Sequence, residues 1–304
     1  MKRIALLLVA LVLTFALAVS LAEEGTAAIT VIETTTASTT REGVEIPTYV
    51  TLPADFDAEK EYPMAVCIHG HHGNHNEWGG YDAVTNGVAE NGIIAVTLDF
   101  AGCGASTEGY ENNAMPCMCA DVLDVVNAMK AQYKISKIGV MGYSMGGRIV
   151  CQMMAEDMLI PDTIVFVAPA VAGDVMINAC GGIDTWNEGK QYCTETGEMY
   201  SFMGPYGEQL LSLAYFEGIE AYGDELASLA AAKYQGNSLM ICADNDTSVP
   251  VEDSLAVAEL FGSTILRTNL CGHSYSFYGT DTAVNNALNA GIITFFTNEL
   301  VAAE

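Results

Sequence analysis

The sequence predicts an α/β fold in which helices cover both faces of a mostly parallel central sheet. Short, continuous apolar runs recur along the 304 residues, as expected of strands that are buried on both faces. Segments with the apolar spacing of helices separate these runs, and such alternation is typical of parallel sheets. One stretch of about seventy residues interrupts the alternation and is too long for an ordinary connection. Together these observations predict one large domain with a small insertion.

The individual elements follow from the same patterns. The segment Thr30–Leu52 is rich in Thr, Val and Ile around a turn at Arg41–Gly43, which predicts an opening antiparallel hairpin. The apolar runs that we expect to be buried strands are Met64–Ile68, Ile93–Leu98, Ile138–Met141, Thr163–Val167, Ser238–Cys242 and Thr264–Thr268. Helices are expected near Met118–Tyr133, Met145–Met158, Val251–Phe261 and Ala283–Asn298.

The insertion is expected at about residues 171–225, between the strands that end near Val167 and begin near Ser238. It contains many aromatic residues, among them Trp186 and Tyr215. Disordered segments are poor in aromatic residues, so we expect a folded cap over the carboxyl edge of the sheet. Its rings either stack on an aromatic substrate or form the small core of the cap itself.

The first residues have the organisation of a secretory signal peptide. Lys2 and Arg3 precede an apolar run from Ile4 to Val19, and small residues follow at Ser20–Ala22. An uncleaved membrane anchor is the alternative, but the apolar run is short for a membrane span. We therefore expect residues 1–22 to be removed, residues 23–304 to form the mature domain, and the protein to be secreted.

Charge and cysteine content restrict the partners of the chain. The net charge of −27 disfavours nucleic acid and anionic membranes, so we expect no nucleic-acid partner and no stable membrane association after signal removal. Nine cysteines in an exported chain leave at least one unpaired. The candidates for disulfides are Cys103, Cys117, Cys119, Cys180, Cys193 and Cys271, whose pairing the sequence leaves open.

The strongest motif is G-x-S-x-G at Gly142–Gly146, centred on Ser144. It lies where a predicted strand becomes a predicted helix, which is the position of a nucleophile on a sharp strand-to-helix turn. The glycines two residues before and after the serine allow the strand and helix to approach each other. Ser144 is therefore the predicted nucleophile.

A serine hydroxyl needs a base and an acid that orients the base. With an elbow of this type, the acid and then the histidine follow the nucleophile along the chain. His273 is the only histidine after Ser144, so we expect it to be the base. Asp244 and Asp246 both follow the penultimate strand, and either carboxylate could orient the imidazole.

The oxyanion hole is expected in the turn His69–Gly73, directly after the strand Met64–Ile68. Such turns direct a backbone N–H at the oxyanion, together with the N–H of the residue after the nucleophile. These would be the N–H groups of His71 and Met145. Three histidines in one turn also suggest a metal site, but no cluster of carboxylates lies beside them, so we expect no metal.

Taken together, HGHHG, DFAGCGAS (Asp99–Ser106), GYSMGG, ADNDTSVP and CGHSY resemble the α/β-hydrolase superfamily. Within it, the chain is most similar to feruloyl (cinnamoyl) esterases and serine-aminopeptidase-like hydrolases, over nearly all of residues 23–304. The resemblance implies the α/β-hydrolase fold, a carboxylic ester substrate and Asp246 as the acid, because D-x-x-V-P before a helix is familiar in this group. Ala101, where a basic residue is common, and Cys271 depart from the pattern.

The sequence thus predicts a secreted serine esterase with a Ser-His-Asp triad and no cofactor. Its expected partner is a small-molecule or polysaccharide-linked ester, with feruloyl or acetyl esters of plant origin as candidates. A serine exopeptidase-like hydrolase is an alternative, because Glu188, Glu195 and Glu198 could bind a free amino terminus. A non-catalytic binding protein on the same scaffold is the other alternative, although such a protein has no need of the whole catalytic set.

Overall fold

The computed structural model describes residues 28–204, 207–275 and 282–301. The signal peptide expected at residues 1–22 lies outside the described residues. Within the described ranges, no helix is both long and apolar enough to cross a membrane.

In the described part of the chain, the main sheet has eight strands in the order β1-β2-β4-β3-β5-β6-β9-β10. The pairs β1–β2 and β2–β4 are antiparallel and the other neighbours are parallel, so the predicted mostly parallel sheet is confirmed. The strands are β1 (Thr30–Ala37), β2 (Glu45–Leu52), β3 (Tyr62–Ile68), β4 (Ile94–Leu98), β5 (Ile135–Tyr143), β6 (Thr163–Val167), β9 (Asn237–Ala243) and β10 (Thr264–Thr268). Each apolar run predicted as a strand lies in one of them, except that β4 begins one residue later than predicted, at Ile94.

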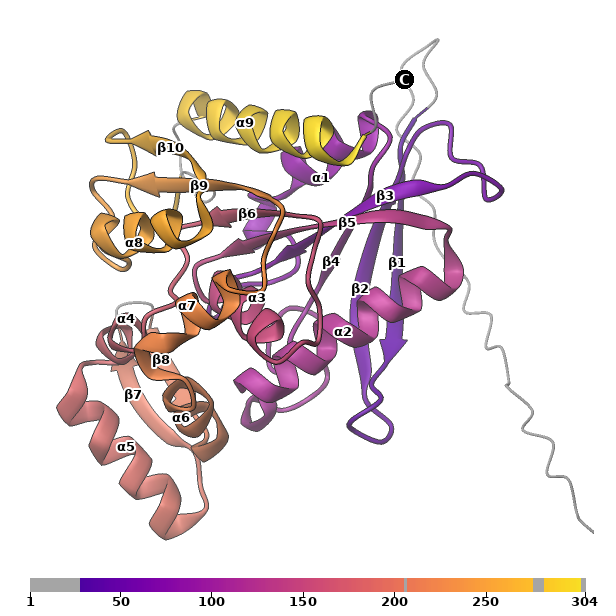
Figure 1. The fold of residues 1–304 in the computed structure, drawn as a ribbon. Helices are drawn as coiled ribbons and strands as arrows, with labels where there is room; N and C mark the ends of the chain where they lie inside the picture. Colours follow the sequence, from indigo (N-terminus) through magenta and orange to yellow (C-terminus); the bar gives the residue numbers. More distant parts are fainter. Residues whose placement is uncertain (1–27, 205–206, 276–281, 302–304) are drawn as a thin grey trace, which may run out of the picture.

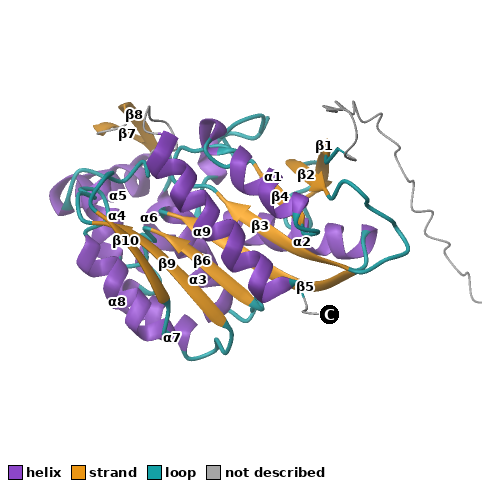
Figure 2. Ribbon diagram, turned by 90° about the horizontal axis from the view of Figure 1, so that it is seen from above, coloured by secondary structure: helices purple, strands orange, loops and turns teal. Residues whose placement is uncertain are grey.

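Helices cover both faces of this sheet, as predicted (Figures 1 and 2). One face carries α1 (Asp82–Glu90) and α9 (Thr282–Leu300), which pack against each other. The other face carries α2 (Met115–Gln132), α3 (Met145–Ala155), α7 (Leu226–Ala231) and α8 (Val251–Phe261). This double cover buries every residue of β4 and β6, which explains their continuous apolar sequences.

The long stretch between β6 and β9 is folded and aromatic at its centre. Before α7 it contains α4 (Gly173–Ala179), α5 (Ile183–Thr196), the hairpin β7 (Tyr200–Gly204) and β8 (Gly207–Leu211), and α6 (Leu213–Glu220). Most of these elements lie to one side of the sheet (Figure 1). The ring centroids of Trp186 and Phe216 are 4.7 Å apart, and both side chains are buried with Tyr215. These rings therefore form an aromatic core within the inserted segment.

Arg148 joins the helix α3 to this inserted segment. Its side chain is fully buried and its guanidinium donates to the carbonyl oxygens of Val171 and Ile219, the second at 2.6 Å from Nη2. Burial lowers the pKa of Arg148. A buried cation is stable here only because backbone carbonyls from two separate segments accept its hydrogen bonds.

The nine cysteines all lie in the described ranges, and Cys67, Cys103, Cys117, Cys119, Cys151, Cys180, Cys193 and Cys242 are free thiols. Five of the six disulfide candidates, Cys103, Cys117, Cys119, Cys180 and Cys193, are therefore not joined to one another, and the expectation of disulfides among them is wrong. Eight of the nine thiols are buried, and Cys117 is partly exposed. Apart from Cys117, the candidates are helix and loop residues whose buried side chains fill the interior, as a small apolar residue would.

Candidate active site

Ser144 stands on the sharp turn between β5 and α3. Its backbone has φ 52° and ψ −119°, a conformation that non-glycine residues rarely adopt. The Ser144 N–H donates to the carbonyl of Val167 at 2.9 Å, and its own carbonyl accepts from the N–H of Ala170 at 2.9 Å. The neighbouring strand end thus holds the serine in a strained backbone geometry.

The flanking glycines are required by close approaches between backbones. A Cβ at Gly146 would lie 2.4 Å from the carbonyl oxygen of Ile68, at the end of β3. A Cβ at Gly142 would lie 2.7 Å from the backbone nitrogen of Gly147. Any side chain at either position would push the strand and helix apart and move Ser144.

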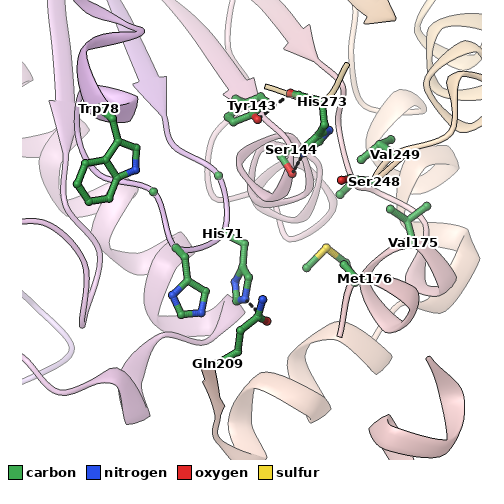
Figure 3. Close-up of a pocket in the computed structure, with 15 residues that line it drawn as sticks. His71, Trp78, Tyr143, Ser144, Val175, Met176, Gln209, Ser248, Val249 and His273 are labelled. Carbon is green, nitrogen blue, oxygen red and sulfur yellow. Dashed lines mark hydrogen bonds between the residues drawn. The ribbon is translucent and has the colours of Figure 1, made fainter. Parts of the chain in front are cut away.

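The structure brings the three predicted triad residues together. The Nε2 atom of His273 lies 3.0 Å from Ser144 Oγ, and Nδ1 lies 2.8 Å from Asp246 Oδ2 (Figure 3 shows the first contact). The carboxylate acceptor implies that Nδ1 carries the proton, which leaves Nε2 free to accept the serine proton. The hydroxyl of Tyr143 donates to the His273 carbonyl at 2.8 Å and thus holds the histidine loop.

Asp246 is held by its own hydrogen bonds, whereas Asp244 points elsewhere. The N–H groups of Ser248 and Val249 donate to Asp246 Oδ1 at 2.9 and 2.8 Å. Asp244 instead forms an ion pair with Arg267 on β10, and its carboxylate is exposed. The geometry therefore selects Asp246 as the partner of His273.

The two expected oxyanion donors come from different elements, since His71 lies in the turn after β3 and Met145 directly follows Ser144 at the start of α3. Among the hydrogen bonds of the described residues, none uses the N–H of His71 or of Met145. The neighbouring N–H of Gly70 is occupied, since it donates to Oε1 of the buried Glu77 at 2.5 Å. The N–H groups of His71 and Met145 thus remain available for the oxyanion, and their role as its donors stays a prediction.

Glu77 is a site residue that sequence reasoning missed. Its backbone has φ 46°, and the next residue, Trp78, has φ 55°, so two successive non-glycine residues adopt left-handed geometry. This unusual turn carries the carboxylate back to Gly70, below the oxyanion turn. No motif marks a single acidic residue in a loop, so the sequence contained no signal for it.

Asp99, which begins the DFAGCGAS loop, fixes the far end of the same region. Its carboxylate accepts from the hydroxyl of Tyr49 at 2.9 Å, the N–H of His75 at 2.6 Å and the N–H of Ala105 at 2.9 Å. It thereby joins the loop after β4 to the segment that follows the oxyanion turn.

Burial lowers the pKa of all three histidines in the turn, and nothing in the described ranges groups them around a metal ion. His69 is fully buried, with Nδ1 2.8 Å from the Gly70 carbonyl and Nε2 accepting from the N–H of Phe100 at 3.3 Å. Burial lowers the pKa of His69 to about 4 and that of His71 to about 3. Burial also lowers the pKa of His72. Within the described ranges, no three His, Cys, Asp or Glu side chains are grouped as metal ligands.

A cavity of about 270 Å³ opens beside Ser144 (Figure 3). The inserted segment supplies part of its wall, with Val175, Met176 and Ala179 from α4 and Gln209 from β8. Sequence reasoning missed these four residues, because nothing local distinguishes a cavity wall from the rest of a cap. The other described lining residues are Gly70, His71, His72, Gly73, Trp78, Tyr143, Ser144, Ala170, Ser248, Val249 and His273, and none of the fifteen carries a carboxylate or a permanent cation.

By sequence, residues 63–189 match the profile of the serine aminopeptidase S33 family. No curated protein matches the chain by sequence.

Solved structures resemble this one over most of its length. Est1E from Butyrivibrio proteoclasticus with ferulic acid bound has a TM-score of 0.71 at 19% identity, over 88% of this chain and 98% of that chain. The esterase EaEST from Exiguobacterium antarcticum has a TM-score of 0.59 at 15% identity, over 86% of this chain and 98% of that one. Porphyromonas gingivalis dipeptidyl peptidase 4 has a TM-score of 0.58 at 17% identity, over 88% of this chain but 35% of its own. Esterases and a peptidase thus share this fold, and the site itself must distinguish between their reactions.

Proposed function

We propose that this chain is a serine hydrolase of the α/β-hydrolase superfamily that cleaves carboxylic esters. The observation that carries the proposal is the continuous contact from Asp246 through His273 to Ser144, at 2.8 and 3.0 Å, beside a mostly apolar cavity. A binding protein has no use for this linked set of acid, base and nucleophile.

The mechanism follows from these positions. Ser144 Oγ attacks the ester carbonyl while His273 Nε2 takes its proton, and the carboxylate of Asp246 stabilises the imidazolium that forms. The N–H groups of His71 and Met145 donate to the tetrahedral oxyanion. His273 then protonates the leaving alcohol, and a water molecule repeats the sequence on the acyl-enzyme.

The lining of the cavity favours an ester over a peptide with a free amino terminus. An exopeptidase needs carboxylates to bind the ammonium group of its substrate, and none of the described lining residues is acidic. Glu188, Glu195 and Glu198, which the sequence offered for this purpose, are exposed and are not among the lining residues. The apolar side chains from α4 instead suit the acyl part of an ester.

We also propose which esters the protein cleaves and that it is secreted. Feruloyl and acetyl esters of plant origin, free or linked to a polysaccharide, are the candidate substrates. The likeness of the fold to Est1E with ferulic acid bound supports the first of them. Residues 1–22 support secretion, since they have the basic start, apolar run and small residues of a signal peptide.

Comparison of the mature protein with its Ser144→Ala variant tests the proposal. The substrates are p-nitrophenyl acetate and butyrate, methyl ferulate, and an aminoacyl p-nitroanilide. We expect ester turnover in the wild type and a loss of about 10⁴-fold or more in kcat in the variant, because the nucleophile is removed. Cleavage of the anilide alone would favour the exopeptidase. Equal behaviour of the two proteins on every substrate would favour the non-catalytic binding protein.

A further inference from the structure

Trp78 presents a largely exposed indole to the cavity beside Ser144. It lines the same cavity as Ser144 and His273, and its side chain is 66% exposed. Burial of a large aromatic side chain normally stabilises a fold, and Trp78 contributes little stabilisation of this kind. A ligand in the cavity can therefore contact the indole directly.

The backbone holds Trp78 in this exposed position against its own conformational preference. Glu77 and Trp78 have φ 46° and 55°, in the left-handed region that disfavours bulky residues and that glycine adopts freely. The N–H of Trp78 donates to Oδ1 of Asn74 at 2.9 Å, and the buried Glu77 carboxylate accepts from the N–H of Gly70, so the turn is fixed on both sides. A strained turn that exposes a tryptophan beside a nucleophile indicates that the indole binds a ligand.

Trp78 and the apolar wall of the cavity lie on opposite sides of Ser144 (Figure 3). An ester that reacts with Ser144 extends in two directions from its carbonyl carbon, as the acyl part and the alcohol part. The apolar side chains of Val175 and Met176 suit the acyl part. The side of Trp78 is then left for the alcohol part.

The turn that carries Trp78 also borders a second, polar cavity of about 200 Å³. The turn supplies Asn76, whose amide donates to Oδ1 of Asp82 at 3.2 Å. Glu33 and Asn86 also line this cavity, and none of its described lining residues is Lys or Arg. Amides and carboxylates form hydrogen bonds with neutral hydroxyl groups, whereas carboxylates without a cation repel an anion. The surroundings of Trp78 therefore suit an uncharged group with several hydroxyls.

Resting on the proposed esterase function, we propose that Trp78 binds a neutral sugar, which is the alcohol part of the ester, by stacking against one face of the sugar ring. A pyranose ring carries C–H groups on its faces and hydroxyls around its edge. The faces complement the flat apolar indole, and the edge complements the amides and carboxylates of the polar cavity. An alkyl alcohol offers neither surface, so Trp78 selects sugar esters over alkyl esters.

The first test compares the release of acetate from glycerol monoacetate and from xylotriose acetylated at one hydroxyl. Both esters lie near free hydroxyl groups, but only the second contains sugar rings. We expect kcat/KM, divided by the rate of hydrolysis by hydroxide, to be about fivefold higher or more for the xylotriose ester, the factor that one stacked ring provides. Trp78→Ala should reduce this ratio to about one, and Trp78→Phe, which keeps a smaller flat ring, should retain part of it.

Tyr192→Ala is the matched control, since Tyr192 is an exposed aromatic residue on α5 and is not among the described lining residues of the cavity. It should leave the ratio as in the wild type. Trp78→Gly separates binding from folding, because glycine relieves the left-handed strain. Its midpoint of urea unfolding should equal or exceed that of the wild type, while the preference for the sugar ester is lost. A lower midpoint with equal losses of kcat/KM on both esters would show a structural role and overturn the proposal.

Binding is measured without turnover in Ser144→Ala. The chain has two tryptophans, and Trp186 is buried, so stacking on Trp78 should change the emission of the exposed indole. We expect xylotriose to change the fluorescence saturably, and the change to be absent in Ser144→Ala/Trp78→Phe/Trp78-independent emission of Trp186.

The two measurements distinguish failure of the sugar site from failure of the esterase. Hydrolysis of both esters without preference, and no change in fluorescence, would overturn the sugar site and leave esterase function standing. A saturable change in fluorescence without hydrolysis of any ester would refute the proposed function and leave the sugar site standing.

Discussion

At the scale of single residues, Asp244 and Asp246 show how surroundings assign different tasks to identical side chains. Both follow β9, and only two positions separate them. Asp246 is buried, accepts hydrogen bonds from two backbone N–H groups and is hydrogen-bonded to Nδ1 of His273. Asp244 faces solvent and Arg267. The sequence predicted that both aspartates follow the strand. The direction of each side chain could not be predicted, because it depends on loop geometry that no local pattern encodes.

This difference gives a matched pair of variants. Asp246→Asn should reduce kcat by about 10⁴-fold on p-nitrophenyl acetate, because an amide no longer fixes the protonated Nδ1 of His273. Asp244→Asn removes an exposed ion pair and should leave kcat within about twofold of the wild type. Steady-state kinetics of both variants decide the assignment. The reverse pattern, with Asp244→Asn inactive, would transfer the role of the acid to Asp244.

Gly146 and Gly291 provide a second matched pair of variants. Both are glycines within helices, but a side chain at Gly146 would clash with backbone, whereas there is space for one at Gly291. Gly146→Ala places a methyl group against the Ile68 carbonyl and should lower stability by about 1–3 kcal/mol, with a loss of activity. Gly291→Ala meets only Leu266 at 3.5 Å and should raise stability by up to about 1 kcal/mol, through helix propensity. Urea unfolding of both variants measures the difference. Equal shifts would show that the turn at Ser144 tolerates a side chain.

At the scale of elements, the sequence predicted the parts of the fold that have strong periodicity. The buried strands were recognised because both of their faces are covered, and the limits of α8 were predicted to the residue. An insertion was expected between β6 and β9 from the length and aromatic content of that stretch, but α4, α5 and the β7–β8 hairpin within it were not predicted. These elements lie on a small core of their own, so the patterns of their apolar residues are set by mutual packing and not by one dominant sheet.

Arg148 connects α3 to this inserted segment through its hydrogen bonds to the carbonyls of Val171 and Ile219. Arg148→Met should lower stability by about 2–4 kcal/mol, because two buried carbonyls lose their donor. It should also increase the rate of proteolysis between residues 171 and 225 at constant protease concentration. Arg267→Met is the control, since it removes a guanidinium from the surface of β10. If proteolysis of the segment proceeds at the wild-type rate in Arg148→Met, the segment is held by other contacts.

At the scale of the whole molecule, buried neutral histidines make stability depend on pH. The pKa of His69 falls from its ordinary value of 6.5 to about 4, and that of His71 to about 3. Below pH 6.5 the unfolded chain binds these protons and the folded chain does not, so stability decreases as the pH falls. Each group contributes up to about 1.4 kcal/mol per pH unit between about pH 6.5 and pH 4.

The corresponding measurement is urea unfolding at pH 7.0 and pH 5.5. We expect a lower midpoint at pH 5.5, and a smaller decrease in His69→Gln, which loses one of the two groups. The net charge of −27 acts in the opposite direction, since protonation of carboxylates relieves self-repulsion, but this begins mainly below about pH 5. A midpoint that is constant or rises on acidification to pH 5.5 would show that the two histidines are already accessible to protons.

The buried free thiols can report which parts of the molecule open during unfolding. Burial raises the pKa of Cys67 and Cys151 to about 12, so neither is a reactive thiolate in the folded protein. Cys67 lies in β3, next to the oxyanion turn, and Cys151 lies in the helix that follows Ser144. Cys180 and Cys193 are buried in the inserted segment. Each thiol that becomes susceptible to alkylation therefore identifies the region of the fold that has opened. The order in which the thiols are alkylated gives the order in which these regions unfold.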